Sequence, residues 1–430
     1  MLLLETEATD DERREHVRFA LRFQQLTGPV MAKAVEDTAY YRYTRLVCLN
    51  EVGGDPARFG TGIEELHRRN AGRARWWPLS MTATSTHDTK RGEDAAARIA
   101  VLSEMPDVWR RTVRQWADLM AHARAELEAG PAPSRSLEYL FDQALVGAWP
   151  IGWDGRKGRD ELAARLSAYM QKASNEAKEQ TSWTSPDAAY DEAVQAFVVR
   201  VVNDDALMDH AARFCALVAP HGAVNGLAQT LLKLCSPGVP DTYQGCEGWN
   251  QSLVDPDNRR PVDPAARREA LRSLAGLPAD GRRAAAALLE TYADGRVKLW
   301  VTRTALQARR RFRDLFLFGD AEGIDGGEHL VAMTRAHGQQ RLLCCVPRHS
   351  YVLGEGKTPW PIGAVWGERT LRVPYGGRYR NLFTGALVAA SDQVRVAEIL
   401  ADFPVALLVR EEMTREGGVR EGVRGGEGGS

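Results

Sequence analysis

The pattern of apolar and polar positions predicts short strands between helical segments in the first hundred residues. Residues 11–50 have helical spacing with a predicted break at Gly28-Pro29, and residues 62–75 are again helical in pattern. Apolar residues then alternate over 79–83, which is typical of a strand. A turn rich in hydroxyl residues and a helix rich in Ala, Arg and Glu follow. This order of strand, polar turn and helix predicts an α/β unit.

The rest of the chain divides into a helical part and a strand-rich part. The pattern is almost entirely helical over 107–233, and a second short strand is predicted at 239–243, before a long polar loop. After a helical stretch that ends near residue 295, short alternating runs separated by Gly predict antiparallel strands. Residues 411–430 are rich in Gly and predict a flexible tail. In a barrel of α/β units, the chemistry lies in the loops that follow the strands.

Composition narrows the classes of function. Lys and Arg total 56, Asp and Glu total 57, and a net charge of −1 provides no overall field to attract nucleic acid. No apolar run reaches the roughly 18 residues of a membrane span, and the N-terminal sequence lacks the basic start of a secretory signal. The six cysteines have no metal-ligand spacing and are too few for a disulfide scaffold. We therefore expect a cytoplasmic protein with reduced thiols and no membrane association. Cys344 and Cys345, in a predicted strand, are expected to be buried apolar residues rather than a redox pair.

The densest group of chemical side chains follows the first predicted strand. Residues 86–91 read THDTKR, and Glu93 and Asp94 come directly after them. A His, a carboxylate and two cations lie in the turn between a predicted strand and a predicted helix. In a barrel enzyme, this is where catalytic side chains lie. The alternative is a helix N-cap at Thr86 or Asp88 with solvated charges around it. Asp88 cannot cleave a glycoside alone, because retaining glycosidases need a nucleophile and an acid roughly 5 Å apart; a third carboxylate can only assist.

A second group lies on the helix predicted after Gly28-Pro29. If residues 31–43 are helical, Lys33, Glu36, Tyr40 and Tyr43 fall near one face. Aromatic rings stack on the apolar faces of sugars, and charged groups bind their hydroxyls. The alternative is an amphipathic helix with ion pairs within it.

A third group lies in the loop after the second predicted strand. Asp and Asn next to Pro are ordinary turn residues, so this loop by itself indicates a site only weakly. Its polar and aromatic residues are Asp241, Tyr243, Gln244, Glu247, Trp249 and residues 255–260. The eleven tryptophans permit stacking on sugars, but most of them are expected in the core.

Six segments, taken together and in this order, closely resemble the maltooligosyltrehalose synthases of the α-amylase superfamily, glycoside hydrolase family 13. They are QQLTGPVMAKAVEDTAYYRY, NEVGGDP, STHDTKRGED, YLFDQALVGAWP, SPGVPDTYQGCEGW and SLVDPDNRRPVD. The resemblance runs from about residue 15 to 410. It implies a (β/α)8 barrel with a large helical insertion and a C-terminal β-sandwich. It also implies conversion of the reducing-end α-1,4 bond of malto-oligosaccharides to the α,α-1,1 bond of trehalose, by intramolecular transglucosylation without a cofactor or metal.

The resemblance also implies roles for individual residues. The His-Asp pair that follows the seventh barrel strand matches His87-Asp88, which makes Asp88 the transition-state stabiliser. Lys33 and Glu36 match a segment that surrounds the reducing-end glucose. The substrate-binding residues implied are His87, Lys90, Arg91, Lys33, Glu36, Asp37, Tyr40, Gln244, Glu247 and Trp249.

The nucleophilic Asp and general-acid Glu of that family lie upstream of everything matched here. Residues 1–30 show no strand pattern of the Arg-x-Asp type, and five or six barrel strands are also unmatched. We therefore expect the C-terminal portion of such an enzyme, without nucleophile and acid, and a separately encoded N-terminal half as its partner. The expected regions are 1–106 (last barrel units with the His-Asp motif), 107–230 (helical insertion), 231–295 (final barrel strand, helix and loop), 296–410 (β-sandwich) and 411–430 (tail).

Two alternatives remain open. The chain could be a non-catalytic fragment that binds malto-oligosaccharide or supports assembly, because sugar-facing residues are present without their catalytic partners. An α-amylase-like hydrolase is a weaker alternative, because the helical insertion and the Lys33 and Glu36 segment resemble the synthases, and hydrolysis needs the same unmatched carboxylates.

Overall fold

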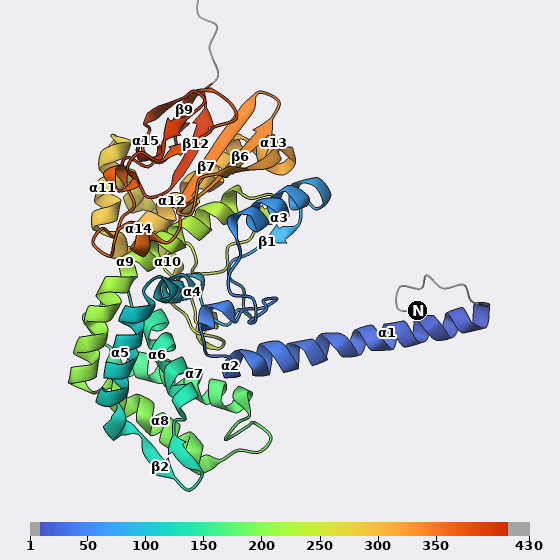
Figure 1. Ribbon diagram of the computed structural model, residues 1–430, viewed down its shortest axis with the longest axis vertical. Coiled ribbons are helices and arrows are strands. Elements are labelled where there is room, and N and C mark those ends of the chain that lie inside the picture. Colours follow the sequence, from blue (N-terminus) through green and yellow to red (C-terminus); the bar gives the residue numbers. More distant parts are fainter. Residues whose placement is uncertain (1–8, 412–430) are drawn as a thin grey trace, which may run out of the picture.

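The computed structural model describes residues 9–411, so most of the predicted tail lies outside the described residues. Figure 1 shows a central group of helices, a strand-rich region at the C-terminal end, and one long helix that extends away from both. None of the helices in residues 9–411 combines the length and the apolar character needed to cross a membrane.

The long helix is α1 (Asp10–Met31), which begins with a reciprocal cap between Thr9 and Glu12. The break predicted at Gly28-Pro29 is wrong, because α1 continues through both residues. Pro29 cannot donate a backbone hydrogen bond, but this part of the helix is exposed, so water can satisfy the freed carbonyl. The irregularity comes later, as a π-helix, η1 (Ala32–Ala39), followed by the single turn α2 (Tyr40–Arg42).

Two predicted strands are confirmed, although both are shorter than expected. Helix α3 (Ile63–Trp76) precedes β1 (Met81–Thr82), and β1 pairs in parallel with β4 (Val239–Pro240). Helix α4 (Glu93–Ala100) follows the polar turn after β1, as the pattern predicts. Since the two strands are parallel, the loops that follow them lie at the same edge.

The central region is helical, as predicted. Its large aromatic core includes Trp116, Phe141 and Phe197, which are fully buried. A small hairpin occupies the predicted Pro and Gly break near residue 130. The elements are α5 (Pro106–Leu119), β2 (Ala125–Leu127), β3 (Gly130–Ala132), α6 (Arg135–Ala148), α7 (Arg159–Ala177), α8 (Ala188–Val202) and α9 (Asp205–Cys235).

Helices continue further toward the C-terminus than the pattern suggests. They are α10 (Pro264–Ser273), α11 (Gly281–Glu290), α12 (Arg296–Arg311) and α13 (Arg313–Phe318). The strand-rich region was expected from residue 296, but its first strand begins at Asp320. The reason is a helical apolar spacing at Val297, Val301 and Ala305, which α12 buries against α9.

The strands form one six-stranded antiparallel sheet in the order β10-β9-β12-β7-β6-β5, with a separate pair β8–β11. One face of the sheet packs on α9, α12 and α13, and the other packs toward β8 and β11. Cys344 and Cys345 lie in the two opposite cores, both buried and unpaired, as predicted. The elements are β5 (Asp320–Asp325), β6 (Leu330–His337), β7 (Gln340–Pro347), α14 (Ser350–Leu353), β8 (Thr370–Leu371), β9 (Gly377–Asn381), β10 (Leu387–Ala390), β11 (Val394–Arg395), α15 (Val396–Ile399) and β12 (Ala406–Arg410).

Candidate functional site

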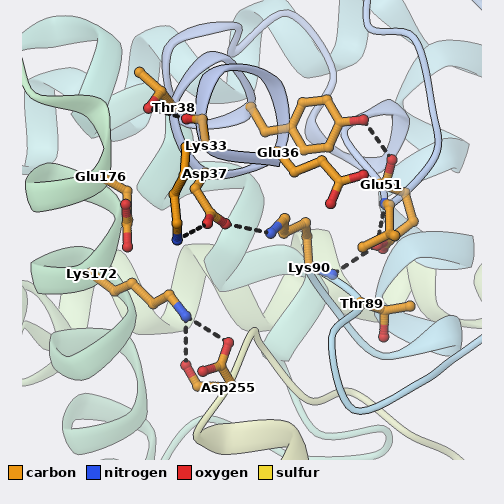
Figure 2. A network of polar contacts seen from close by, with 12 residues as sticks. Lys33, Glu36, Asp37, Thr38, Glu51, Thr89, Lys90, Lys172, Glu176 and Asp255 are labelled. Carbon is orange, nitrogen blue, oxygen red and sulfur yellow. Dashed lines mark hydrogen bonds and ion pairs between the residues drawn. The ribbon is translucent and has the colours of Figure 1, made fainter. Parts of the chain in front are cut away.

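Asp37 joins the first two groups of residues that the sequence singles out. In η1, Lys33 and Asp37 are four residues apart, and Lys33 Nζ lies 2.5 Å from Asp37 Oδ2. The other carboxylate oxygen, Oδ1, lies 3.2 Å from Nζ of Lys90, which comes from the turn after β1. Figure 2 shows the carboxylate between the two ammonium groups. We call Lys33, Asp37 and Lys90 the Asp37 cluster.

The side chains of the cluster differ in their exposure to solvent, from Lys90 at the buried end to Lys33 at the exposed end. The side chain of Lys90 is 6% exposed, that of Asp37 is 24% exposed, and that of Lys33 is 71% exposed. Burial pushes the pKa of Asp37 upward, but hydrogen bonds from Lys33 and Lys90 outweigh it and lower the pKa. The pKa of Lys33 is raised, chiefly by Asp37, with smaller contributions from Glu176 and Asp88. Asp37 and Lys33 therefore stay charged at neutral pH, and Lys33 presents its ammonium group to solvent.

Tyr40, Glu36 and Glu51 form hydrogen bonds in the turn at residues 51–54, next to the Asp37 cluster. Tyr40 is buried, and its hydroxyl lies 2.7 Å from the carbonyl oxygen of Glu51 and 2.9 Å from that of Gly54. Glu36 accepts a hydrogen bond from the backbone of Gly53 at 3.1 Å. Tyr40 therefore braces a turn and does not present a free aromatic face.

Glu51 is a residue that we did not select from the sequence. Its Oε1 accepts hydrogen bonds from the backbone N–H groups of Lys90 and Val52, both at 2.8 Å. Burial raises the pKa of Glu51, and Arg91 and the two N–H groups oppose the shift. The adjacent Gly54 leaves little room, since a Cβ there would lie 2.8 Å from the Glu51 carbonyl oxygen. The double glycine after Glu51 is the local signal of this turn.

The turn with His87 and Asp88 is exposed, and its backbone is held by one hydrogen bond within the turn and one from Asn258. Asp88 N–H donates to Thr86 Oγ1 at 3.2 Å, and Asn258 Nδ2 donates to the carbonyl oxygen of His87 at 3.2 Å. The alternative in which Thr86 or Asp88 caps the next helix is wrong, because α4 has Gly92 as its N-cap. The carboxylate of Asp88 is therefore left free for another role, within the part of the chain that the structure describes.

The charged residues that follow Lys90 point into the protein. Arg91 is buried and donates to the Asn50 carbonyl oxygen at 2.9 Å. Glu93 and Asp94 bind Lys298 Nζ at 2.5 and 2.6 Å, and Glu93 also lies 3.7 Å from Lys233 Nζ. We call Glu93, Asp94, Lys233 and Lys298 the buried tetrad.

The third group is divided by the structure. Asp255 pairs with Lys172 of α7 at 2.6 Å, and Figure 2 shows this pair near Lys33 and Glu176. Lys172 has no local sequence signal, because the contact is formed across 83 residues. Gln244 and Trp249 instead line a separate cleft of about 680 Å³.

The three residues of this loop that are predicted to bind substrate differ in their exposure to solvent. Gln244 is exposed, with its amide 3.5 Å from the Arg260 carbonyl oxygen. Trp249 is half-buried and donates its indole N–H to the Tyr292 carbonyl oxygen at 2.6 Å. Glu247 is half-buried and does not line the cleft. These three residues are not brought together with the Asp37 cluster.

Fold and site together define an α/β protein whose polar side chains gather in loops after two parallel strands, where barrel enzymes place their substrates. No group of three or more His, Cys, Asp or Glu residues in 9–411 is arranged to hold a metal ion.

Comparison with known proteins gives a consistent result. No model of a protein family matches the sequence. Curated relatives in two strains of Mycobacterium tuberculosis, each named "Putative maltooligosyl trehalose synthase", are 39% identical over 396 residues, which is 91% of this chain and 46% of the relative. The solved maltooligosyltrehalose synthase from Arthrobacter ramosus is 38% identical, with a TM-score of 0.75, over 91% of this chain and 46% of that one. A second solved maltooligosyl trehalose synthase is 29% identical, also with a TM-score of 0.75.

The chain spans about half the length of the curated relatives that it matches. Over nearly all of its own length it is similar to the C-terminal portion of maltooligosyltrehalose synthases, and the resemblance identified from the six segments is confirmed.

Proposed function

We propose that this chain is the C-terminal part of a maltooligosyltrehalose synthase of glycoside hydrolase family 13. The single observation that carries the proposal is the Asp37 cluster, which unites two motifs predicted to bind sugar, beside the exposed Asp88. On this proposal β1 and β4 are two strands of a (β/α)8 barrel, and the antiparallel strands are its C-terminal β-sandwich. The names of the similar proteins support the same assignment.

The substrate is a malto-oligosaccharide, and the reaction converts its reducing-end α-1,4 bond to an α,α-1,1 bond. Lys33 and Asp37 offer a donor and an acceptor to sugar hydroxyls at the open end of the cluster. The Asp88 carboxylate faces solvent and stabilises positive charge that develops at the anomeric carbon. No cofactor or metal takes part. The cytoplasmic location expected from the sequence remains a prediction.

The retaining reaction needs two further carboxylates, a nucleophile and an acid, roughly 5 Å apart. We assign them to the part of the similar synthases that lies outside the match. A separately encoded N-terminal half is the partner that the proposal implies. The alternative is a non-catalytic fragment that binds malto-oligosaccharide or supports assembly.

The test mixes the purified chain with maltohexaose, with and without a separately expressed N-terminal half. We expect trehalose-capped product only from the mixture. Asp88→Asn keeps the shape but loses the charge, so we expect the rate to fall about 10²-fold. The exposed Asp392→Asn is the matched control and keeps the wild-type rate.

Each contrary result has a definite meaning. Product from the chain alone refutes the assignment of the nucleophile and acid to the part of the synthases outside the match. Wild-type turnover by Asp88→Asn removes Asp88 from the mechanism. Calorimetric binding of maltohexaose without any turnover by the mixture supports the non-catalytic alternative.

A further inference from the structure

We propose that Trp183 and Glu176 form a subsite for the ring of the reducing-end glucose, next to Lys33. This inference rests on the proposed function, in which Lys33 binds that glucose. Trp183 lies in the loop between α7 and α8, and Glu176 lies in the last turn of α7. The family resemblance that we identified from the sequence assigns a role to neither residue.

The side chain of Trp183 is exposed to solvent and yet held in place. The residue is 56% exposed, and its indole N–H donates to Glu176 Oε1 at 3.1 Å. Ser182 and Ser185 exchange two backbone hydrogen bonds of 3.2 Å, so the loop around Trp183 is a tight turn. A ring held in this way loses little conformational freedom when a ligand binds, and it offers a large apolar face. Trp183 is therefore preorganised to stack on the apolar face of a sugar.

The start of this loop is anchored to the element that carries Lys33. Lys178 Nζ donates to Thr38 Oγ1 of η1 at 3.1 Å. Arg42, in the turn α2 that follows η1, donates from Nε to the carbonyl oxygen of Ala177 at 2.5 Å. These contacts join segments that are 140 and 135 residues apart in the sequence. The fold therefore holds the loop beside η1.

Glu176 connects Trp183 with the exposed end of the Asp37 cluster. Figure 2 shows the carboxylate of Glu176 beside the ammonium group of Lys33, and Glu176 is one of the charges that raise the pKa of Lys33. Within residues 9–411, Lys33 forms an ion pair only with Asp37, and Glu176 Oε2 has no hydrogen-bond partner. One glucose can therefore accept a hydrogen bond from Lys33 and donate one to Glu176 while its apolar face lies on the ring of Trp183.

The reaction gives a reason for stacking at this position. The bond between O4 of the reducing-end glucose and the anomeric carbon of its neighbour breaks, and a bond from O1 to that carbon forms. O4 takes up a proton as it leaves, and O1 loses one as it attacks. O1 and O4 lie at opposite ends of the ring, so rotation of the ring in its own plane exchanges them. Apolar contact is not directional, so the stacked ring can rotate without leaving Trp183.

The test compares two ligands and several variants by calorimetry on the full chain. Maltohexaitol is maltohexaose whose reducing-end ring has been opened by reduction, so it has no ring to stack at that end. We expect Trp183→Ala to weaken maltohexaose binding about tenfold and to change maltohexaitol binding less than about twofold. Trp183→Phe keeps a smaller ring and should recover part of the affinity for maltohexaose.

Phe318→Ala is the matched control. Phe318 is 58% exposed and ends α13, beside the strand-rich region in Figure 1, so its removal should change the affinity for neither ligand. Circular dichroism verifies that every variant folds.

The outcomes separate this inference from the proposed function. Unchanged maltohexaose affinity in Trp183→Ala, equal losses for the two ligands, or a wild-type chain that binds no maltohexaose overturns the subsite. An equal loss in Phe318→Ala overturns it as well. A loss confined to maltohexaose, without trehalose-capped product from the mixture with the N-terminal half, supports the subsite and refutes the proposed function. Trehalose-capped product from that mixture with an unchanged Michaelis constant in Trp183→Ala does the reverse.

Discussion

Two clusters of lysines and carboxylates, which come close in the sequence at Lys90 and Glu93, differ in their access to water. In the Asp37 cluster, Lys33 is 71% exposed, so one ammonium group remains available to a ligand. In the buried tetrad, which begins only three residues after Lys90, no side chain is more than 4% exposed. Both clusters combine lysines with carboxylates. The comparison teaches that burial, and not composition, decides whether such a cluster can bind a substrate or only join parts of the protein.

The buried tetrad holds the elements around the site turn. Glu93 accepts a hydrogen bond from Thr84 Oγ1, so it ties the two ends of the turn that carries Asp88. Burial lowers the pKa of Lys298, but Asp94 and Glu93 outweigh it and raise the pKa. Lys298 lies on α12, so the tetrad joins the turn to a helix about 200 residues further along the chain.

Removal of the cation from the buried tetrad should have the largest effect on stability. Lys298→Met leaves two buried carboxylates without their closest partner, and breaking such a pair costs about 3–5 kcal/mol. Urea denaturation measures the free energy of unfolding. Lys357→Met is the control, because its pair with Glu355 is exposed, and the urea midpoint should not change.

A second substitution shows whether charge is the cause. Adding Asp94→Asn to Lys298→Met removes one of the unpaired charges, and the asparagine oxygen can still accept the hydrogen bond from Asn250 N–H. We expect part of the lost stability to return. A double variant that is less stable than Lys298→Met would contradict the electrostatic explanation of the tetrad.

Glu104 is a half-buried carboxylate with no lysine partner within residues 9–411, and it sharpens the comparison. It accepts hydrogen bonds from the backbone of Tyr351 and Val352, yet burial raises its pKa from 4.5 to about 7. The folded state therefore favours the protonated acid, and stability falls as the pH rises from about 4.5 through 7. Glu104→Gln should add about 2 kcal/mol at pH 8 and nothing at pH 4. A gain that is independent of pH in urea denaturation would refute this.

Breaking the Asp37 cluster should affect binding more than stability. Asp37→Asn removes the charge that holds Lys33 and Lys90, so we expect maltohexaose to bind about tenfold more weakly, a change of about 1.4 kcal/mol. Calorimetry measures the affinity. Since the pKa of Asp37 is lowered from 3.8, its contribution to stability is present above pH 3.8 and lost below the lowered pKa. An unchanged affinity would exclude the cluster from the binding site.

Much of this arrangement could be predicted from the sequence, because it depends on local patterns. Alternation predicted β1, and turn residues predicted the loop after it. The long α1 was missed because a local rule treats Pro29 as a helix end and takes no account of its exposed surroundings. The contact between Asp37 and Lys90 joins residues 53 apart, and only the family resemblance related the two motifs in advance. The contacts of Glu51 had no periodic signal at all.

Trp249, which lies beside the buried tetrad, provides the test with the smallest expected effect. It asks whether a side chain next to the tetrad also binds substrate. The sequence predicts that it binds substrate, but its ring centre lies 5.8 Å from Nζ of Lys298, on the side of the buried tetrad. Its indole N–H donates to the Tyr292 carbonyl oxygen. Trp249→Phe removes that donor, so we expect a loss of about 1 kcal/mol in urea denaturation and less than a twofold change in maltohexaose affinity.

Trp77→Phe is the matched control, because Trp77 is 72% exposed and should change neither quantity in the isolated chain. A tenfold loss of maltohexaose affinity in Trp249→Phe would favour the sequence prediction, since a phenylalanine ring offers a smaller stacking surface to a sugar. It would also mean that the cleft of about 680 Å³ beside Trp249 belongs to the substrate path. The surface that binds substrate would then extend from the Asp37 cluster past Asn258 to the edge of the buried tetrad.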